Sequence, residues 1–413
     1  MNSWASVAVP PLDSRFTLPA LSLWDTARSG KHPLSKKELY RLYVCGITPY
    51  DATHLGHAAT YLTFDLINRY LRATGSEVKF VQNITDIDDP LLERAARDGQ
   101  DWRELAQSQI DLFRGDMVNL HIIPPDHYIG VVEAMDLVEA SISALTAAST
   151  TYKVDDDLYF SVRSDVDFGI RSHLTQEKMI EIFAERGGDP LRAGKRDPLD
   201  ALLWLHKRPG EPSWPSSNGE GRPGWHIECC AIALHYLEPD AESSTSIDIQ
   251  GGGSDLIFPH HEMSAAQGKI LQGREFAGHY VHSGMIGLDG VKMSKSLGNL
   301  VFVSTLVASG TDPMAIRWAL MESHYSEDRS WSAQLLADSE SWLVRLRAAL
   351  SMMESASTDA VIKEIIESQS DNLDTPRALR AIKSWIIQSE GGSNGGAAGE
   401  LSRALDSILG LSI

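Results

Sequence analysis

Hydrophobic positions change their spacing twice between residues 39 and 84, and this pattern predicts three successive elements. The run LYRLYVCGI (39–47) is apolar enough for a buried strand, and EVKFVQNI (77–84) alternates as a second strand. Between them, LGHAATYLTFDLINRYLRATG repeats its apolar residues at helical spacing and stops at Gly75, a residue typical of helix C-termini. A strand, a helix and a strand at this spacing predict a βαβ unit, and therefore a parallel sheet.

The remaining chain falls into segments of different pattern. Residues 1–39 look irregular and predict an N-terminal extension. The sequence over 121–220 is polar and rich in predicted loops, so we expect an inserted connective subdomain there. It would divide an α/β domain into 40–120 and 221–300. Within the second part, WHIECCAIALHYL predicts a helix, SIDIQ a strand, and GGGSDLIFPHHEMSAAQGKIL a glycine turn that enters a helix. Residues 301–413 are almost wholly helical in pattern.

Composition narrows the class of protein. The chain has 413 residues, enough for roughly two to three domains, and its hydrophobic content of 43% is ordinary for a globular protein. The sequence has no apolar run long enough to span a membrane and no signal-peptide pattern at its start, so we expect a cytoplasmic protein. Three cysteines cannot form a disulfide framework and suggest metal binding, catalysis or packing. A net charge of −19 makes a nucleic-acid partner less expected, although a local basic patch stays possible.

Two motifs suit a nucleotide triphosphate. His54 and His57 lie at i and i+3 at a helix start, Gly56 lets a ligand approach the backbone, and a helix N-terminus attracts phosphate. An H-x-G-H string also arises by chance. In DGVKMSKSLGN, Lys292 and Lys295 could neutralise charge that builds on a triphosphate. The alternative is a solvated surface loop, which is difficult to reconcile with the histidine pair upstream.

A second set of residues suits a substrate and a metal ion. Glycines at a strand end followed by Ser254 and Asp255 could hold a ribose or an α-amino group, although a tight turn would explain the glycines equally well. Cys45, Cys229 and His260 offer two thiolates and an imidazole, a ligand set that suits zinc. Buried cysteines without a metal are the alternative. Cys230 points to another side of its helix and is interpreted as packing.

Together these motifs resemble class I aminoacyl-tRNA synthetases of the cysteinyl branch. The resemblance implies a class I synthetase-type Rossmann (HUP) parallel sheet that makes cysteinyl-adenylate from cysteine and MgATP, with one zinc ion per chain binding the substrate thiol. The segments that carry it are CGITPYD, THLGHAATY, NITDIDD, KRDPLDALLW, PGEPSW, GRPGWHIEC, GGGSDLIFPHHE, HSGMIG and KMSKSLGN.

The resemblance also implies a role for individual residues. Zinc would be bound by Cys45, Cys229 and His260. Phosphate charge would be stabilised by His54, His57, Lys292 and Lys295, and Ile286 would offer its backbone to adenine. The substrate and ATP pocket would comprise Cys45, Gly46, Ile47, Thr48, Thr60, Asn83, Ile84, Thr85, Trp225, Gly253, Ser254 and Asp255.

Several positions depart from the tRNA-charging pattern. A glutamate, an arginine and a lysine usual in that branch are replaced by Ser264, Ala59 and Pro90, and the segment after KMSKS is short and acidic. These departures resemble a neighbouring family, the mycothiol-pathway ligases that join cysteine to the amine of glucosaminyl-inositol. That family shows the segment ERGGDP, which is otherwise a polar turn. Its residues here, predicted as an acceptor region, are Glu185, Arg186, Gly187, Gly188, Asp189 and Pro190.

The expected partners are therefore small molecules: L-cysteine, ATP and glucosaminyl-inositol. No nucleic acid or membrane partner is expected, and we expect a monomer. A short cysteinyl-tRNA synthetase and a non-catalytic binding module remain the alternatives. The sequence identifies neither the acceptor pocket, nor the base that takes the amine proton, nor a fourth zinc ligand.

Overall fold

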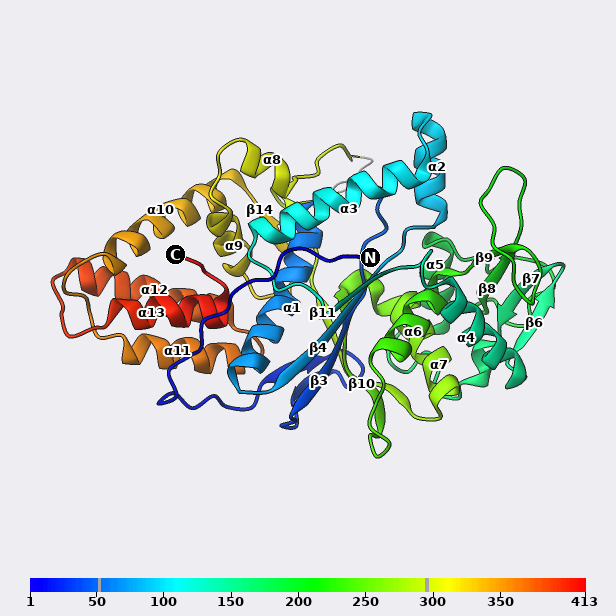
Figure 1. The fold of residues 1–413 in the computed structure, drawn as a ribbon, viewed down its shortest axis with the longest axis horizontal. Helices are drawn as coiled ribbons and strands as arrows, with labels where there is room; N and C mark the ends of the chain where they lie inside the picture. Colours follow the sequence, from blue (N-terminus) through cyan, green and yellow to red (C-terminus); the bar gives the residue numbers. More distant parts are fainter. Residues whose placement is uncertain (51–52, 294–296) are drawn as a thin grey trace.

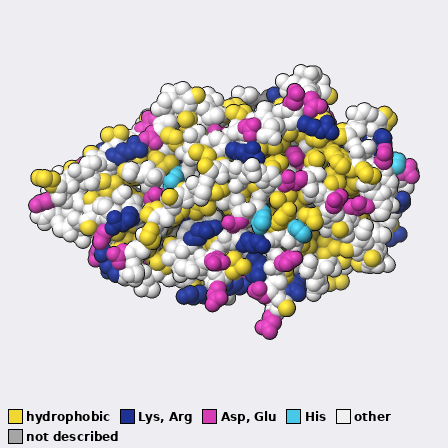
Figure 2. Space-filling view, in the orientation of Figure 1, with side chains coloured by type: hydrophobic (Ala, Val, Ile, Leu, Met, Phe, Trp, Pro, Cys, Tyr) yellow, Lys and Arg dark blue, Asp and Glu magenta, His cyan; other side chains and the backbone are white. Residues whose placement is uncertain are grey.

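Figure 1 shows a central sheet with helices on both sides, a helical region at one end and a second, smaller sheet at the other. The structure is a computed structural model that describes residues 1–50, 53–293 and 297–413. Among these residues no helix combines the length and the apolar character needed to cross a bilayer. Over the face drawn in Figure 2, Lys and Arg side chains are interspersed with Asp and Glu.

The central sheet has five parallel strands in the order β11-β10-β3-β4-β5. The chain passes from β3 outward to β5 and then returns to add β10 and β11 on the other side, so the direction of winding switches between β3 and β10. This confirms the predicted parallel α/β sheet. Its strands are Leu39–Val44 (β3), Glu77–Ile84 (β4), His127–Gly130 (β5), Thr245–Gly253 (β10) and Glu275–Ser283 (β11).

Alternation along β3 divides the interior into two apolar layers. Tyr40, Leu42 and Val44 join one core, whereas Tyr43 and Cys45 join the other. Because successive side chains of a strand point to opposite faces, each layer of helices covers one of these sets. The first layer holds α1 (Leu55–Ala73) and α3 (Trp102–Asn119), with α2 (Asp89–Asp98) packed on α3; the second holds α4 (Met135–Ala147), α6 (Trp225–Tyr236) and α7 (Glu262–Gln272).

The smaller sheet is antiparallel, in the order β6-β7-β8-β9. The range 121–220 was predicted as an insertion, yet β5 within that range belongs to the central sheet and β9 begins just after it. The domain boundaries themselves stay a prediction. The elements are Thr151–Val154 (β6), Asp157–Phe160 (β7), a 3₁₀ turn at Val162–Ser164, Gln176–Glu185 (α5), Ala201–His206 (β8) and Gly221–Pro223 (β9).

The first 39 residues contain a β-hairpin that the sequence pattern did not reveal. Strand β1 (Ser22–Asp25) pairs antiparallel with β2 (Gly30–Pro33). The buried Asp25 carboxylate accepts the amide of Ala27 at 3.0 Å and pairs with Arg28, which closes the turn. Four-residue strands leave too few alternating positions for a periodic signal, and this one is stabilised by contacts with distant segments.

The C-terminal region is helical as predicted, apart from one short strand. Strand β14 (Arg329–Trp331) pairs parallel with β12 (Ile286–Leu288), which also pairs with β13 (Val291–Lys292). Asp312 and Asp374 cap two of the helices with their side chains, each followed by a proline in the first turn. The helices are Val303–Ala308 (α8), Pro313–Met321 (α9), Ala333–Leu350 (α10), Asp359–Ser370 (α11), Thr375–Glu390 (α12) and Ala398–Ala404 (α13), the last continuing into Leu405–Leu409.

A buried ion cluster joins α1 to this region. The Asp65 carboxylate accepts from Arg69 Nε at 2.8 Å and from Arg317, and all three side chains are fully buried. The guanidinium groups also donate to backbone carbonyls, among them that of Leu409 at 2.7 Å. Although burial opposes its charge, the two arginines lower the pKa of Asp65 below its usual value. The cluster therefore fixes α1, whose N-terminus carries the histidine pair, against the last turn of the chain.

Replacing Asp65 with Asn should destabilise the fold strongly. Two buried guanidinium groups would lose the charge of Asp65, with Asp406 left as a more distant partner of Arg69 at 3.4 Å, and breaking a buried pair on one side costs about 3–5 kcal/mol. The free energy of unfolding, measured in urea, checks this value. The control is Glu390→Gln in the surface pair with Arg345, whose hydrogen bonds are 2.6 and 2.9 Å long; there we expect less than about 1 kcal/mol. Equal effects of the two variants would contradict the assigned importance of the buried cluster.

Candidate active site

The candidate site lies at the C-terminal ends of β3, β4 and β10, where the winding direction switches. Beyond β3, the amide of Cys45 donates to the Gly251 carbonyl at 3.0 Å, and the amide of Gly46 donates to Asn83 Oδ1 at 2.8 Å. A Cβ atom at Gly46 would stand 1.6 Å from the Asn83 carbonyl oxygen, so only glycine fits. Open α/β sheets bind ligands at such switch points.

The glycine triplet lies at the end of an extended strand, which is one of the two interpretations that the sequence left open, and not in a tight turn. Gly251, Gly252 and Gly253 are the last residues of β10 and pair with β11. A Cβ at Gly251 would lie 2.2 Å from the Phe64 ring of α1, and one at Gly252 would lie 3.0 Å from the His261 ring. Gly251 is therefore required because α1 approaches the strand closely, and Gly252 leaves room for the His261 ring. The helix predicted after them starts later, as a 3₁₀ turn (Ser254–Leu256) and a π turn (Ile257–His261) before α7.

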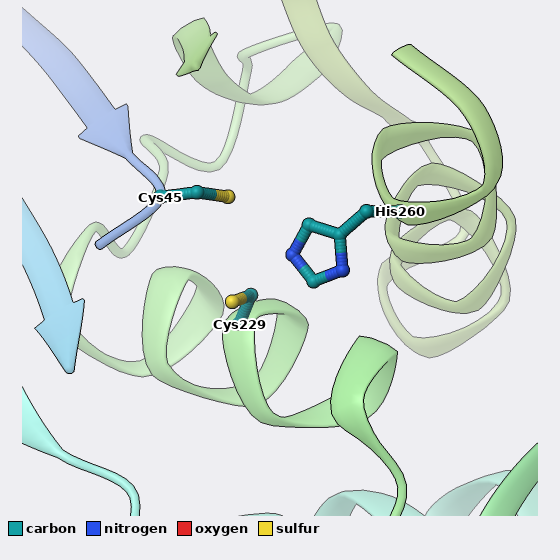
Figure 3. Close-up of side chains that lie close together, drawn as sticks. All are labelled: Cys45, Cys229 and His260. Atoms are coloured by element: carbon teal, nitrogen blue, oxygen red, sulfur yellow. The ribbon is translucent and has the colours of Figure 1, made fainter. Parts of the chain in front are cut away.

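Cys45, Cys229 and His260 converge from three separate elements, as the close-up in Figure 3 shows. Their candidate ligand atoms all lie within 4.8 Å of one another, and all three residues are buried. Cys45 follows β3, Cys229 lies on α6, and His260 precedes α7. The sequence prediction that these residues form one cluster is thus confirmed, although 184 and 31 positions separate neighbouring members along the chain.

The chemistry of His260 fits a metal ligand. Its Nδ1 lies 3.0 Å from Nδ1 of His226, whereas its Nε2 is buried and has no hydrogen-bond partner among the described residues. Trp225 stacks on the ring at a centroid distance of 4.2 Å. Metal-binding imidazoles typically use one nitrogen for the ion and bond the other to a neighbouring group. A buried nitrogen without a partner is costly unless such a ligand satisfies it.

The two thiols of the cluster have opposite tendencies to ionise. Burial raises the pKa of Cys45 well above its usual value, and the hydrogen bond with Cys229 adds to this. Burial also opposes ionisation of Cys229, but the hydrogen bond from Cys45 and the nearby His260 ring bring its pKa well below the usual value. The Cys229 thiol therefore loses its proton more readily than the Cys45 thiol. Cys230 is buried outside the cluster, where burial raises its pKa, in keeping with a packing role.

The predicted phosphate-binding histidines lie at the start of α1. His54 is the N-cap and accepts the Gly56 amide at Nδ1, at 3.0 Å, and the rings of His54 and His57 lie 4.1 Å apart. Burial and the neighbouring His54 lower the pKa of His57 to about 3. His57 is therefore neutral near pH 7, and it can donate an N–H to a phosphate but cannot supply a positive charge.

The lysines of the predicted loop are only partly described. Lys292 is exposed at the end of β13, and its carbonyl accepts from Asn299 at 3.1 Å. Lys295 lies outside the described residues. The chain after this loop reaches the histidine pair, because the Leu55 amide donates to Val301 at 2.9 Å and His54 forms a β-bridge with Phe302. The two predicted phosphate motifs are therefore connected through residues 301–302.

The other predicted pocket residues mostly line the same edge of the sheet. The Thr85 amide donates to Ile47 at 3.0 Å, and Thr60 lies 3.8 Å from where a Cβ of Gly253 would be. Ile286 lies apart from these strands, in β12 opposite Arg329. The remaining positions are Thr48 after β3, Ile84 at the end of β4, Trp225 at the start of α6, and Ser254 and Asp255 after β10.

The predicted acceptor region, residues 185–190, reaches the site through one side chain. The Arg186 guanidinium contacts the carbonyls of Asp255 and Phe258, which lie on either side of the turn before His260. Asp189, in contrast, accepts from Lys195 at 2.9 Å and from Tyr159, so it stabilises the fold of the surrounding loops. Glu185 ends α5, and Gly187, Gly188 and Pro190 lie in the turn that follows.

Sequence reasoning missed a set of histidines around the cluster. His261 Nε2 lies 3.3 Å from Cys45 Sγ, and His261 Nδ1 lies 2.8 Å from His282 Nε2. Burial lowers the pKa of His282 to about 3 and brings that of His261 well below its usual value, so both rings are neutral. Only their positions in the sequence could have indicated these histidines: His261 directly follows a candidate ligand, and His282 lies near the end of a parallel strand. Ser264 donates to the His226 carbonyl at 3.2 Å.

Comparisons with known proteins agree with this geometry. Residues 31–341 match the sequence family "tRNA synthetases class I (C) catalytic domain". Curated proteins from Nocardia farcinica (strain IFM 10152) and Streptomyces griseus subsp. griseus, both named L-cysteine:1D-myo-inositol 2-amino-2-deoxy-alpha-D-glucopyranoside ligase, are 51% identical over the full length of both chains. Among solved structures, Mycobacterium tuberculosis methionyl-tRNA synthetase in complex with methionyl-adenylate has a TM-score of 0.62 at 17% identity, covering 91% of this chain and 89% of that one.

A metal-content measurement tests the cluster directly. Cys229→Ser should lose bound metal, because a hydroxyl replaces the thiol that ionises most readily, whereas Cys230→Ala should retain it. Elemental analysis of both purified variants and of the wild-type protein, after dialysis against metal-free buffer, measures the difference. The adjacent cysteines share a helix and full burial, so Cys230→Ala controls for general damage to α6. Equal metal content in the two variants would count against Cys229 as a ligand.

Proposed function

This chain belongs to the family of L-cysteine:1D-myo-inositol 2-amino-2-deoxy-alpha-D-glucopyranoside ligases, which contain the class I (C) synthetase catalytic domain, and we propose that it activates L-cysteine with MgATP and transfers it to the amine of glucosaminyl-inositol. It is an ATP-dependent ligase that forms an amide. The observation that carries the cysteine specificity is the buried cluster of Cys45, Cys229 and His260 at the switch point of the sheet.

The proposed ion in the cluster is zinc, one per chain. Zinc held by two thiolates and an imidazole would supply an open coordination position, which a thiolate occupies far more readily than the hydroxyl of serine. The surroundings of His260 are suited to binding such an ion. Its buried Nε2 has no hydrogen-bond partner among the described residues, and Trp225 and His226 fix the orientation of the ring. Ser264 stands where a glutamate would add a fourth protein ligand, so three protein ligands leave room for the substrate.

Activation requires the carboxylate of cysteine to attack the α-phosphorus of ATP and release diphosphate. The neutral His57 ring can donate a hydrogen bond to a phosphate oxygen, whereas the Leu55 and Gly56 amides already donate to Val301 and His54. Because this donor is uncharged, positive charge for the leaving diphosphate would come from Mg²⁺, Lys292 and Lys295. In the second step the acceptor amine attacks the acyl carbon, AMP leaves, and an amide forms. The amine must lose a proton first, since only its neutral form has a free electron pair.

The acceptor is proposed to enter beside residues 185–190. Arg186 contacts the carbonyls of Asp255 and Phe258, so this turn borders the segment that leads into His260. A sugar held there would lie next to the activated cysteine. The acidic balance of the chain, −19, also favours a small amino-sugar, which is cationic when protonated, over a polyanion such as tRNA. A cytoplasmic monomer remains part of this proposal.

An acceptor assay should distinguish the ligase from a short cysteinyl-tRNA synthetase. With cysteine and MgATP present, glucosaminyl-inositol should accelerate AMP release several-fold, because it consumes the adenylate, whereas uncharged tRNA should leave the rate unchanged. Quantifying AMP and the amide product by chromatography measures both arms. Acceleration by tRNA alone would overturn the proposed acceptor, and failure of cysteine-dependent ATP–diphosphate exchange would overturn the activation step as well.

Replacing Cys45 with Ser should abolish zinc binding and cysteine activation together. The substitution removes a soft ligand while it changes the size of the side chain little. Zinc content and ATP–diphosphate exchange with cysteine are measured on one preparation, and exchange with serine serves as a specificity control for the wild-type enzyme. A variant that holds zinc and exchanges at the normal rate would remove Cys45 from the ligand set.

A further inference from the structure

A continuous chain of hydrogen bonds leads from the cluster to the N-terminal hairpin. It runs from Cys45 Sγ to His261 Nε2 (3.3 Å), from His261 Nδ1 to His282 Nε2 (2.8 Å), and from His282 Nδ1 to Thr26 Oγ1 (2.8 Å). His261 and His282 are buried, with exposures of 1% and 8%. Thr26 lies in the turn after β1, outside the residues that match the synthetase catalytic domain.

Only two arrangements of protons satisfy this chain when both imidazoles are neutral. Each neutral ring has one N–H donor and one acceptor nitrogen, so all the bonds must point either toward the sulfur or away from it. Cys45 as a metal ligand is a thiolate and has no proton to donate. His261 must then donate Nε2–H to sulfur, His282 must donate Nε2–H to His261, and His282 Nδ1 must accept. Among the described residues, the partner of this acceptor on its outer side is the hydroxyl of Thr26.

The backbone holds that hydroxyl in place. The Thr26 amide donates to the Tyr280 carbonyl at 2.9 Å, and the Tyr280 amide donates to Asp25 Oδ1 at 3.3 Å, so the hairpin turn is docked on β11. The Thr26 carbonyl accepts from His173 Nε2 at 3.0 Å. The Thr26 side chain is only partly buried, and its position is set mainly by these backbone contacts.

We propose that Thr26 is a positioning residue for the metal centre: its hydroxyl fixes the tautomers of His282 and His261, so that His261 presents an N–H to the Cys45 thiolate. This inference rests on the proposed function, because it assumes that Cys45 binds zinc. A hydrogen bond to a ligating sulfur holds the ligand in one orientation and lowers its charge. The proposal gives the N-terminal hairpin a part in cysteine binding that acts through His282 and His261.

Thr26→Val tests the proposal, because valine matches threonine in shape but has no hydroxyl. Without the donor, His282 Nδ1 is unsatisfied or takes the proton, and the chain no longer has to point toward sulfur. We expect the affinity for zinc, measured by competition with a chelator, to fall about 10-fold, the lower end of what loss of such an outer-sphere partner causes. The KM for cysteine should rise by a similar factor, while the KM for ATP stays unchanged.

Two further variants separate a hydrogen-bond effect from a packing effect. Thr26→Ser keeps the hydroxyl and should restore both the affinity for zinc and the KM for cysteine. Thr375→Val removes another threonine hydroxyl, which bonds the Met321 carbonyl at 2.8 Å in the helical region, and should change neither value. Should Thr26→Val fail to fold, Thr26→Ala makes the same comparison with a smaller side chain.

The outcomes distinguish this inference from the function it rests on. A wild-type protein that binds zinc, together with a Thr26→Val variant that matches it in zinc affinity and in the KM for cysteine, overturns the inference alone. A general loss of activity with equal changes in both KM values, reproduced by Thr26→Ser, also overturns it, because it indicates a structural role. A wild-type protein that binds no zinc overturns both proposals.

Discussion

The candidate site depends on two close approaches: the segment just after β3 lies against β4, and α1 lies against β10. Gly46 and Gly251 permit them, because a Cβ at either position would overlap the Asn83 carbonyl or the Phe64 ring. Because neither glycine has a side chain, Cys45 can follow β3 directly beside Gly251, on the face of the sheet that α6 and α7 cover. The position of Cys45 in the candidate metal cluster is thus a consequence of strand alternation: successive residues of β3 face opposite sides of the sheet, so Cys45 shares a face with Tyr43 and not with Val44.

The local elements of this region could be predicted from sequence because their signals are local. The pattern of EVKFVQNI marks β4 at its observed ends, and α1 ends at Ala73, just before Gly75. The metal triad was predicted from chemistry and from the resemblance to synthetases. The histidine chain was not, because His261, His282 and Thr26 meet only through tertiary packing and none has a diagnostic spacing. The glycine triplet could not be assigned to a strand end or a tight turn for the same reason: the sequence signals a need for small residues but not which neighbour causes it.

The site has fewer positively charged side chains than its motifs suggest. Two histidines near a triphosphate are easily assumed to be cationic, but burial keeps His57 neutral at pH values well above 3. In the proposed adenylation, its contribution is then a directed N–H and not a charge, and protonation of His57 is not expected to produce a pH dependence near neutrality. In the same proposal, positive charge comes from Mg²⁺, Lys292 and Lys295. Of the two lysines, the described Lys292 is exposed, whereas His57 lies at the start of α1, where burial lowers its pKa.

The helical C-terminal region is connected to the chemistry from two sides. The buried pair of arginines around Asp65 fixes it to α1, while Asn372 accepts the Trp24 amide at 2.7 Å and so holds the hairpin that carries Thr26. The first contact orients the helix that begins at the histidine pair, and the second orients the outer end of the hydrogen-bond chain to Cys45. A region that supports both the nucleotide side and the metal side of a pocket has a structural role in a ligase with a small acceptor. That role needs no contact between these helices and a substrate.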